Sequence, residues 1–218
     1  MPKLQAAQIA VTPFQQNCAL IWDAETRRGV VVDPGGDVPR IQAALDRADF
    51  TVERILLTHG HLDHAGGAAA LKAALEAKQG APVPVEGPHR ADEFLLQGIP
   101  VQAAQYGLEG MDSVTPDRWL ADGDVVSIAG QEFGVLHCPG HAPGHVVFVA
   151  PGLGFAILGD VLFRGSIGRT DFPYGDHAAL LDAIRTKLFP LGDEIRFLCG
   201  HGPGSTIGEE RRSNPFLK

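Results

Sequence analysis

Residues 58–67 read Thr58-His59-Gly60-His61-Leu62-Asp63-His64-Ala65-Gly66-Gly67, and this stretch decides how the rest of the sequence is interpreted. It follows an apolar run rich in β-branched residues at 52–58 (VERILLT) and precedes a segment rich in Ala, Leu, Lys and Glu. The pattern predicts a strand over 52–58, a polar loop, and a helix over about 65–78. Ligands of α/β proteins bind where strands end, so the loop is a candidate site.

The residue types in this loop are those that bind metal ions. Side chains two apart on an extended chain share a face, so His59 and His61 point the same way. Asp63 and His64 then fall at the start of the helix and can face a second ion. Neutral imidazole and carboxylate are good ligands for zinc, iron and manganese, so we predict that all four bind metal.

Three other strand ends carry further candidate ligands. His141 lies in 137–145 (HCPGHAPGH), Asp160 closes the strand ending in LGD at 158–160, and His201 lies in GHGP at 200–203. Asp160 arrives alone from a separate strand, so we predict that its carboxylate bridges two cations. Seven candidate ligands and few cysteines favour an open two-metal site over a closed structural zinc site.

The spacing of His137, His141 and His145 could suggest one face of a helix, but the prolines and glycines between them exclude a helix. We therefore predict His141 alone as a ligand. His137 and His145 are expected to support the loop through hydrogen bonds, although His145 could equally just open the strand HVVFVA. Cys138 and Cys199 are interpreted as small buried residues rather than ligands.

Composition limits the possible partners and compartment. The chain has 218 residues, which suits a single domain spanning 1–218, and a net charge of −8 without a dense Lys/Arg run, which argues against nucleic-acid binding. Three widely spaced cysteines do not form a disulfide framework. No apolar stretch is long enough to span a membrane and the N-terminus lacks a signal-peptide core, so we expect a cytoplasmic protein without a membrane partner.

The remaining pattern predicts two packed sheets with helices outside. Asp37 is the expected N-cap of the first helix, and residues 80–122 are expected to be irregular, with a short helical piece near 92–97, forming a lid or the wall of a cleft. The predicted strands lie at 4–11, 18–23, 29–33 and 195–199 and as short strands from 124 to 160, and the predicted helices at about 37–48 and 177–188.

The motifs THGHLDHAGG, HCPGHAPGH, LGD and GHGP resemble those of the metallo-β-lactamase superfamily. With GRTDF at 168–172 and NPF at 214–216, they are similar to the small single-domain bacterial members of its glyoxalase II branch. The resemblance implies an α/β fold, a four-layer αββα sandwich. Larger glyoxalase II enzymes continue into a helical domain that contacts glutathione, and we expect that domain to be absent here.

The resemblance also implies roles for individual residues. It implies that Asp160 contacts both metals and that Arg169 helps to bind the glutathione part of the substrate. The remaining ligands divide into His59, His61 and His141 for one metal, and Asp63, His64 and His201 for the other. Two divalent ions are expected, zinc first, with iron or manganese as alternatives.

The expected activity is hydrolysis of a thioester, an S-acylglutathione such as S-lactoylglutathione. Asp63 would orient the nucleophile, and Arg169, with Arg164 as a further candidate, would hold a substrate carboxylate. One alternative is a persulfide dioxygenase with a single Fe(II) on His59, His141 and Asp160.

Three further hypotheses keep the same fold. A nuclease is disfavoured by the acidic charge. A β-lactamase fits less well, because Asp160 stands where such enzymes commonly carry cysteine. A scaffold without catalytic activity is disfavoured by the complete set of ligand residues.

Overall fold

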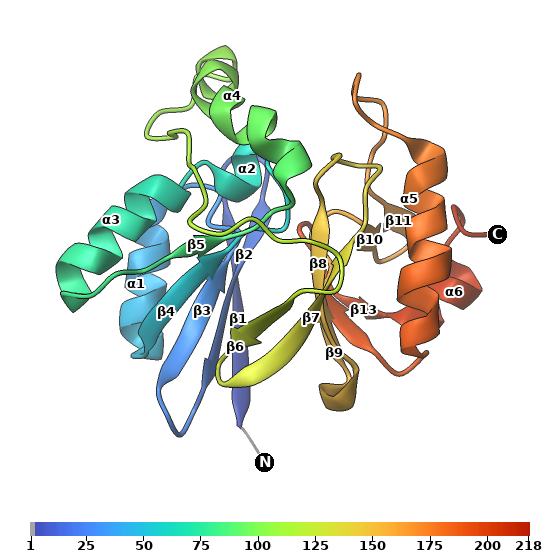
Figure 1. The fold of residues 1–218 in the computed structure, drawn as a ribbon, viewed down its shortest axis with the longest axis horizontal. Helices are drawn as coiled ribbons and strands as arrows, with labels where there is room; N and C mark the ends of the chain where they lie inside the picture. The colour runs from blue at the N-terminus through green and yellow to red at the C-terminus, as the bar shows by residue number, and fades with distance from the viewer. Residues whose placement is uncertain (1–2) are drawn as a thin grey trace.

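The computed structural model describes residues 3–218, which form four layers: two facing β-sheets with helices on both outer faces (Figure 1). This αββα sandwich is the α/β architecture that the sequence predicts. Helices α1 and α3 cover one sheet, and α5 and α6 cover the other, while α4 lies above the edge that carries α2 (Figure 1).

The first sheet is built by the N-terminal part of the chain. Its strand order is β1-β2-β3-β4-β5, with antiparallel pairing from β1 to β3 and parallel pairing from β3 to β5. Parallel pairing requires crossover connections, which α1 and α3 supply. The strands are β1 Leu4–Val11, β2 Gln16–Asp23, β3 Arg28–Val32, β4 Thr51–Leu56 and β5 Val85–Glu86.

The second sheet has the order β13-β12-β9-β8-β7-β6, antiparallel except for the parallel pair β9 and β12. A two-stranded hairpin of β10 Leu162–Phe163 and β11 Ser166–Ile167 stands apart from it. The strands of the sheet are β6 Val125–Ile128, β7 Gln131–His137, β8 Val146–Ala150, β9 Phe155–Ile157, β12 Arg196–Leu198 and β13 Ser205–Thr206.

The first helix, α1 Val38–Ala48, forms where predicted, but Asp37 does not cap it through its side chain. Asp37 has a positive φ of 49°, and its Oδ2 accepts the backbone N–H of Thr12 at 2.8 Å. Asp37 is thus the N-cap residue by position, as predicted, but its carboxylate ties α1 to the end of β1 instead of bonding the first turn of the helix.

The helix expected over 65–78 is two helices, α2 Leu62–Ala65 and α3 Ala68–Gln79. The break falls at Gly66 and Gly67, where the chain passes close to the segment after β3. A Cβ on Gly67 would lie 2.6 Å from the carbonyl oxygen of Pro34. The close approach sets α2 apart as a single turn that carries Asp63 and His64.

The segment 80–122 is more regular than predicted. The short helical piece extends into α4, Glu93–Gln105, despite Pro100 inside it. Leu95, Leu96 and Ile99 are buried, so packing of this apolar face stabilises the helix beyond the residues where local signals end. Near the C-terminus, α5 His177–Ala183 continues as a wider helical turn over Ile184–Leu188. Strand β13 and helix α6 Ile207–Ser213 were not predicted.

Three apolar clusters hold the four layers together. One packs the first sheet against α1, α3 and α4, one packs the second sheet against α5 and α6, and one lies between the two sheets. Phe133 and Phe148 of the second sheet and Ile21 of the first are among the buried residues of the middle cluster. Within residues 3–218, no helix combines the length and apolarity needed to cross a bilayer.

Candidate metal centre

The polar segments singled out in the sequence meet at one edge of the sandwich. Their loops follow β4, β7, β9 and β12, and α2 lies at the same edge, below α4 (Figure 1). The structure brings all seven predicted ligand residues together there: His59, His61, Asp63, His64, His141, Asp160 and His201.

Six of these candidate ligand residues fall into two groups that could each hold a metal ion, and His59 and His64 also form a third group with Asp33. The first consists of His59, His61 and His141, all buried, whose nearest ring nitrogens lie within 4.8 Å of one another. The second consists of Asp63, His64 and His201, with the same limit on their ligand atoms. Such separations let each group surround one ion, since ligand atoms lie about 2 Å from zinc.

Asp160 lies between the two groups. Its Oδ1 is 3.3 Å from Nε2 of His64, and its Oδ2 is 3.5 Å from Nε2 of both His141 and His201. The carboxylate therefore approaches members of each group, which is the arrangement expected of a bridging ligand. Its side chain is only 9% exposed.

The donor atoms fit divalent cations. Nε2 of His64, Nε2 of His141 and Oδ1 of Asp160 are buried, and none of them makes a well-aligned hydrogen bond within residues 3–218, although the first and the third lie 3.3 Å apart. Buried polar atoms without partners are costly, and here they converge from different loops. Imidazole nitrogen with carboxylate oxygen, without cysteine, is a donor set that zinc, iron and manganese accept.

Asp33 and Thr58 orient two of the imidazoles, and sequence reasoning did not identify either residue. Oδ2 of Asp33 lies 2.9 Å from Nδ1 of His64 and accepts the Thr58 hydroxyl at 2.7 Å. Thr58 Oγ1 in turn lies 3.0 Å from Nδ1 of His59. Because Thr58 gives its proton to Asp33, it accepts one from His59, and both rings keep Nε2 free for a ligand. The only signal in the sequence is an aspartate that ends the buried run GVVVD.

The outer nitrogens of His141 and His61 also have partners. Nδ1 of His141 donates to the backbone carbonyl of Arg169 at 2.8 Å. Nε2 of His61 lies 2.8 Å from the hydroxyl of Tyr174, a residue that sequence reasoning missed, while its Nδ1 faces Nε2 of His59 at 3.1 Å. His61 is thus turned the opposite way from His59, His64 and His141.

His137 and His145 support the loops, as predicted. Nε2 of His145 accepts the backbone N–H of Asp160 at 3.0 Å, and its ring stacks on that of His59 at 4.5 Å. Nε2 of His137 donates to the carbonyl of Pro143 at 2.8 Å. The prolines and glycines of the loop therefore hold His137 and His145 in positions that differ from that of the ligand candidate His141.

Asp92 joins two ligand loops, which the sequence did not indicate. Its carboxylate accepts the backbone N–H of Gly60 at 2.8 Å and that of Gly144 at 2.5 Å. The loop of His59 and His61 is thereby fixed to the loop of His141. Burial raises the pKa of Asp92 to about 6, although both hydrogen bonds act in the opposite direction.

Gly200 shows why GHGP requires glycine before His201. A Cβ at Gly200 would lie 2.0 Å from Oδ1 of Asp160 and 2.6 Å from Cε1 of His64. Only a residue without a side chain lets the chain after β12 pass this close to the shared carboxylate.

The pKa values of the histidines shift in opposite directions in the two groups. Burial first, and then the neighbouring His141, lower the pKa of His61 to about 3, and burial also lowers the pKa of His59, so both rings are neutral. Burial would lower the pKa of His64 as well, but the carboxylates of Asp160, Asp63 and Asp33 outweigh it and raise that pKa. The second group thus favours positive charge at its centre, as a cation site requires.

A cleft of about 260 Å³ is lined by five of the candidate ligand residues, His61, Asp63, His141, Asp160 and His201. Its wall is largely aromatic and includes Phe14, Gln102, Tyr106, Phe172 and Tyr174. Gln102 and Tyr106 come from the end of α4, so the segment expected as a lid or cleft wall does line the cleft.

The predicted substrate residue Arg169 also lines the cleft. Its Nε and Nη2 each lie 2.7 Å from an oxygen of Asp171, and its guanidinium lies 4.5 Å from the centre of the Phe172 ring. The other candidate, Arg164, is exposed and is not among the cleft residues. The cysteines Cys138 and Cys199 are buried, as expected, and neither belongs to a ligand group within residues 3–218.

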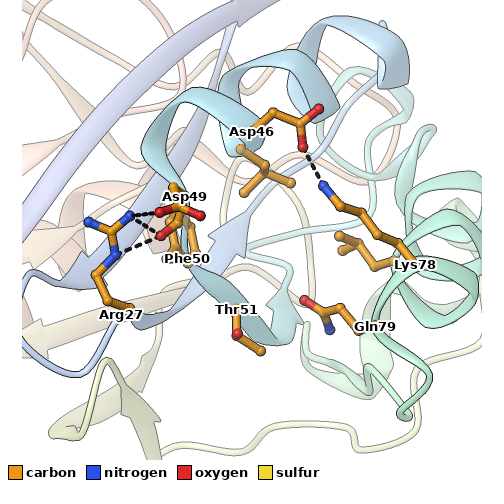
Figure 2. A pocket seen from close by; sticks show the side chains of 9 residues that line it. Arg27, Asp46, Asp49, Phe50, Thr51, Lys78 and Gln79 are labelled. Atoms are coloured by element: carbon orange, nitrogen blue, oxygen red, sulfur yellow. Dashed lines mark hydrogen bonds and ion pairs between the residues drawn. The ribbon is translucent and has the colours of Figure 1, made fainter.

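A second hollow of about 390 Å³ lies between the ends of α1 and α3 (Figure 2). Its charged side chains pair with each other, Arg27 with Asp49 and Lys78 with Asp46 (Figure 2). Gln79 is also occupied, because it bonds both backbone polar groups of Val52. The charged and amide side chains of this hollow are therefore already bonded to other groups of the protein. The histidine cleft, in contrast, presents donor atoms that could bind a metal ion.

Comparison with known proteins agrees with the motifs and the fold. A family model described as the metallo-beta-lactamase superfamily matches residues 11–201. A Haemophilus influenzae protein, hydroxyacylglutathione hydrolase GloC, is 47% identical over 210 residues, 96% of each chain. The structure of the BLEG-1 B3 metallo-β-lactamase is 34% identical with a TM-score of 0.86 and coverage of 98% of this chain and 99% of that one. TTHA1623 in a di-iron-bound form is 38% identical, with a TM-score of 0.84 and coverage of 97% and 100%.

The family match spans every loop that carries a candidate ligand, from His59 to His201. The relatives are matched over nearly their full length, so the likeness is not confined to the motifs. The chain belongs to the metallo-β-lactamase superfamily, in its glyoxalase II-like branch.

Proposed function

We propose that this protein is a thioester hydrolase that uses two divalent cations and acts on an S-acylglutathione such as S-lactoylglutathione. The observation that carries the proposal is Asp160, whose carboxylate lies between two groups of ligand residues next to a cleft. The likeness to a hydroxyacylglutathione hydrolase supports the same substrate class.

The proposed ligand sets follow the two groups. His59, His61 and His141 hold one ion, Asp63, His64 and His201 hold the other, and Asp160 contacts both. Zinc is the first choice for this donor set, with iron or manganese as alternatives. The di-iron-bound relative supports iron as a serious alternative.

When bound, two such cations lower the pKa of water and polarise a carbonyl group. In this chain Asp63 is the acidic residue placed to orient the water: its Oδ2 lies 3.3 Å from Nε2 of His201, and its side chain is 18% exposed and borders the cleft. The water gives up a proton to solvent, its oxygen adds to the thioester carbon, the C–S bond breaks, and glutathione leaves as the thiolate. Because a thiolate is a good leaving group, the residues need not include a strong general acid.

We propose that Arg169 holds a carboxylate of the substrate. Asp171 occupies Nε and Nη2, and the guanidinium lies over the Phe172 ring, 4.5 Å from its centre. A guanidinium has five N–H donors, so N–H groups remain for a second carboxylate. Arg169 therefore offers positioned N–H donors at the cleft wall, although its ion pair with Asp171 offsets part of its positive charge.

Two alternatives remain to be tested beside the thioester. The likeness to a B3 metallo-β-lactamase favours a β-lactam as the second candidate substrate. A persulfide dioxygenase would need only one metal, which makes Asp63, His64 and His201 an unexplained second group.

The deciding experiment combines metal analysis of the purified protein with three assays run on one preparation. S-lactoylglutathione hydrolysis is followed by thiol release, glutathione persulfide oxidation by oxygen uptake, and β-lactam cleavage with a chromogenic cephalosporin. We expect thiol release that depends on bound metal, without oxygen uptake. Oxygen uptake at a comparable rate, or cephalosporin cleavage that exceeds thioester cleavage, would overturn the proposal.

A further inference from the structure

The ring of His61 is held differently from the other ligand histidines. The outer nitrogen of His141 faces a backbone carbonyl, and that of His64 faces the Asp33 carboxylate at 2.9 Å, with the amide nitrogen of Gln16 farther away at 3.3 Å. His61 instead turns Nε2 outward to the hydroxyl of Tyr174, at 2.8 Å. A hydroxyl can both accept and donate a proton, so this contact accommodates either tautomer of the ring.

The geometry determines which tautomer a bound cation needs. Nδ1 of His61 faces Nε2 of His59 at 3.1 Å and belongs to the first ligand group. To offer a lone pair there, the neutral ring must carry its proton on Nε2, where Tyr174 Oη is in place to accept it. Without the hydroxyl, the proton on Nε2 would depend on solvent at the edge of the cleft.

The hydroxyl is held by its own neighbours. The ring of Tyr174 stacks on Phe172 with centroids 5.3 Å apart and an interplanar angle of 13°, and meets the edge of Phe94 at 5.4 Å. Phe172 belongs to the loop that follows Arg169, and Phe94 to the first turn of α4. Tyr174 therefore connects the metal group with the loop after Arg169 and with the first turn of α4.

We propose that Tyr174 is a positioning residue for the metal group of His59, His61 and His141: its Oη accepts Nε2–H of His61 and fixes the ring with Nδ1 facing inward. This role rests on the proposed two-metal function. It requires no contact between Tyr174 and the ions themselves, since Tyr174 acts through His61.

The test is Tyr174→Phe, which removes the hydroxyl and keeps the ring that stacks on Phe172 and Phe94. Zinc affinity is measured by competition with a chromogenic chelator, and the cobalt-substituted protein is compared by its visible absorption spectrum. We expect zinc binding at one of two sites to weaken about tenfold, as for other lost partners of ligand histidines, and we expect the cobalt spectrum to change. At excess zinc, kcat should recover most of its value, because the defect lies in holding the ion.

Tyr106→Phe is the matched control, because Tyr106 lies in the same cleft and residues 3–218 show no hydrogen bond from its hydroxyl to a ligand histidine. It should bind zinc and cobalt as the wild type does. Zinc affinity of Tyr174→Phe within about twofold of wild type, with an unchanged cobalt spectrum, would overturn the positioning role.

Failure of the proposed function is distinguishable, because the binding measurements use no substrate. Weakened zinc binding in Tyr174→Phe together with no thioester cleavage by the wild type would retain the positioning role and reject the substrate. A wild-type protein that binds no divalent cation would overturn both.

Discussion

Nδ1 of His64 lies 2.9 Å from Oδ2 of Asp33, and both side chains are buried. Asp33 ends its strand with a positive φ of 51°, and its carboxylate also accepts the backbone N–H and the hydroxyl of Thr58. One carboxylate thus orients a member of each ligand group, His64 directly and His59 through Thr58. Metal ligands of this kind depend on such partners for ring orientation.

Asp33→Asn is therefore expected to impair metal binding without removing a ligand. The side-chain amide of the variant would place an N–H donor opposite Nδ1 of His64 or the Thr58 hydroxyl, which also donate. One hydrogen bond is therefore lost, and the ring of His64 is no longer held in one orientation. We expect metal affinity and turnover to fall roughly 10- to 100-fold. Metal content by mass spectrometry and kcat with S-lactoylglutathione measure this. Asp46→Asn, in the exposed pair with Lys78, is the control and should bind metal normally. Full metal content in Asp33→Asn would contradict the orienting role.

Asp63→Ala tests the proposed orientation of the nucleophile. Asp63 belongs to the second candidate group and borders the cleft, so the variant loses both a proposed ligand and the group proposed to orient the water. We expect kcat to fall by about 10²- to 10⁴-fold, the range typical of a lost acid–base group. Metal content is determined on the same sample. Near-wild-type turnover with the second metal absent would sink the two-metal mechanism.

Gly200→Ala should damage the site through crowding alone. The new methyl group would lie 2.0 Å from Oδ1 of Asp160, so the carboxylate or the chain must shift. We expect a loss of about 1–3 kcal/mol in the free energy of unfolding, together with weaker metal binding. Gly152→Ala is the matched control, since no heavy atom lies within 4 Å of its added Cβ. Chemical denaturation and chelator competition compare the two, and equal behaviour of both variants would argue against tight packing at Gly200.

Asp92 predicts a specific pH dependence of stability. Burial raises its pKa from 3.8 to about 6, so between these values the folded protein binds a proton that the unfolded chain releases. The free energy of unfolding contributed by Asp92 is therefore greatest at low pH, falls as pH rises through this window, and levels off above about pH 6. Asp92→Asn removes this titration and leaves the metal ligands unchanged.

The measurement is the difference in unfolding free energy between wild type and Asp92→Asn, taken from about pH 4 to about pH 7. The wild type should lose up to about 3 kcal/mol relative to the variant over that range. Titrations shared by both proteins cancel in the difference. A difference that stays constant with pH would mean that the hydrogen bonds from Gly60 and Gly144 keep Asp92 ionised throughout.

Several features of the fold followed from local signals. The strands that end at His59, Asp160 and His201 are short apolar runs closed by glycine or polar residues, and their positions agree with prediction to within a few residues. Long-range packing decided the rest. Helix α4 extends past its local signals because its apolar face is buried, and the helix expected over 65–78 breaks where Gly67 approaches Pro34.

The superfamily, the layered architecture and the set of imidazole and carboxylate groups at the strand ends could be predicted from the amino-acid sequence, because each depends on residue types and spacings a few positions long. The nitrogen of each ring that faces inward could not be predicted and is known from the folded chain alone. That choice depends on Asp33, on Tyr174 and on the carbonyl of Arg169, which reach the rings from other segments. An imidazole has two nitrogens, and its orientation depends on the partner that packing brings to the outer one.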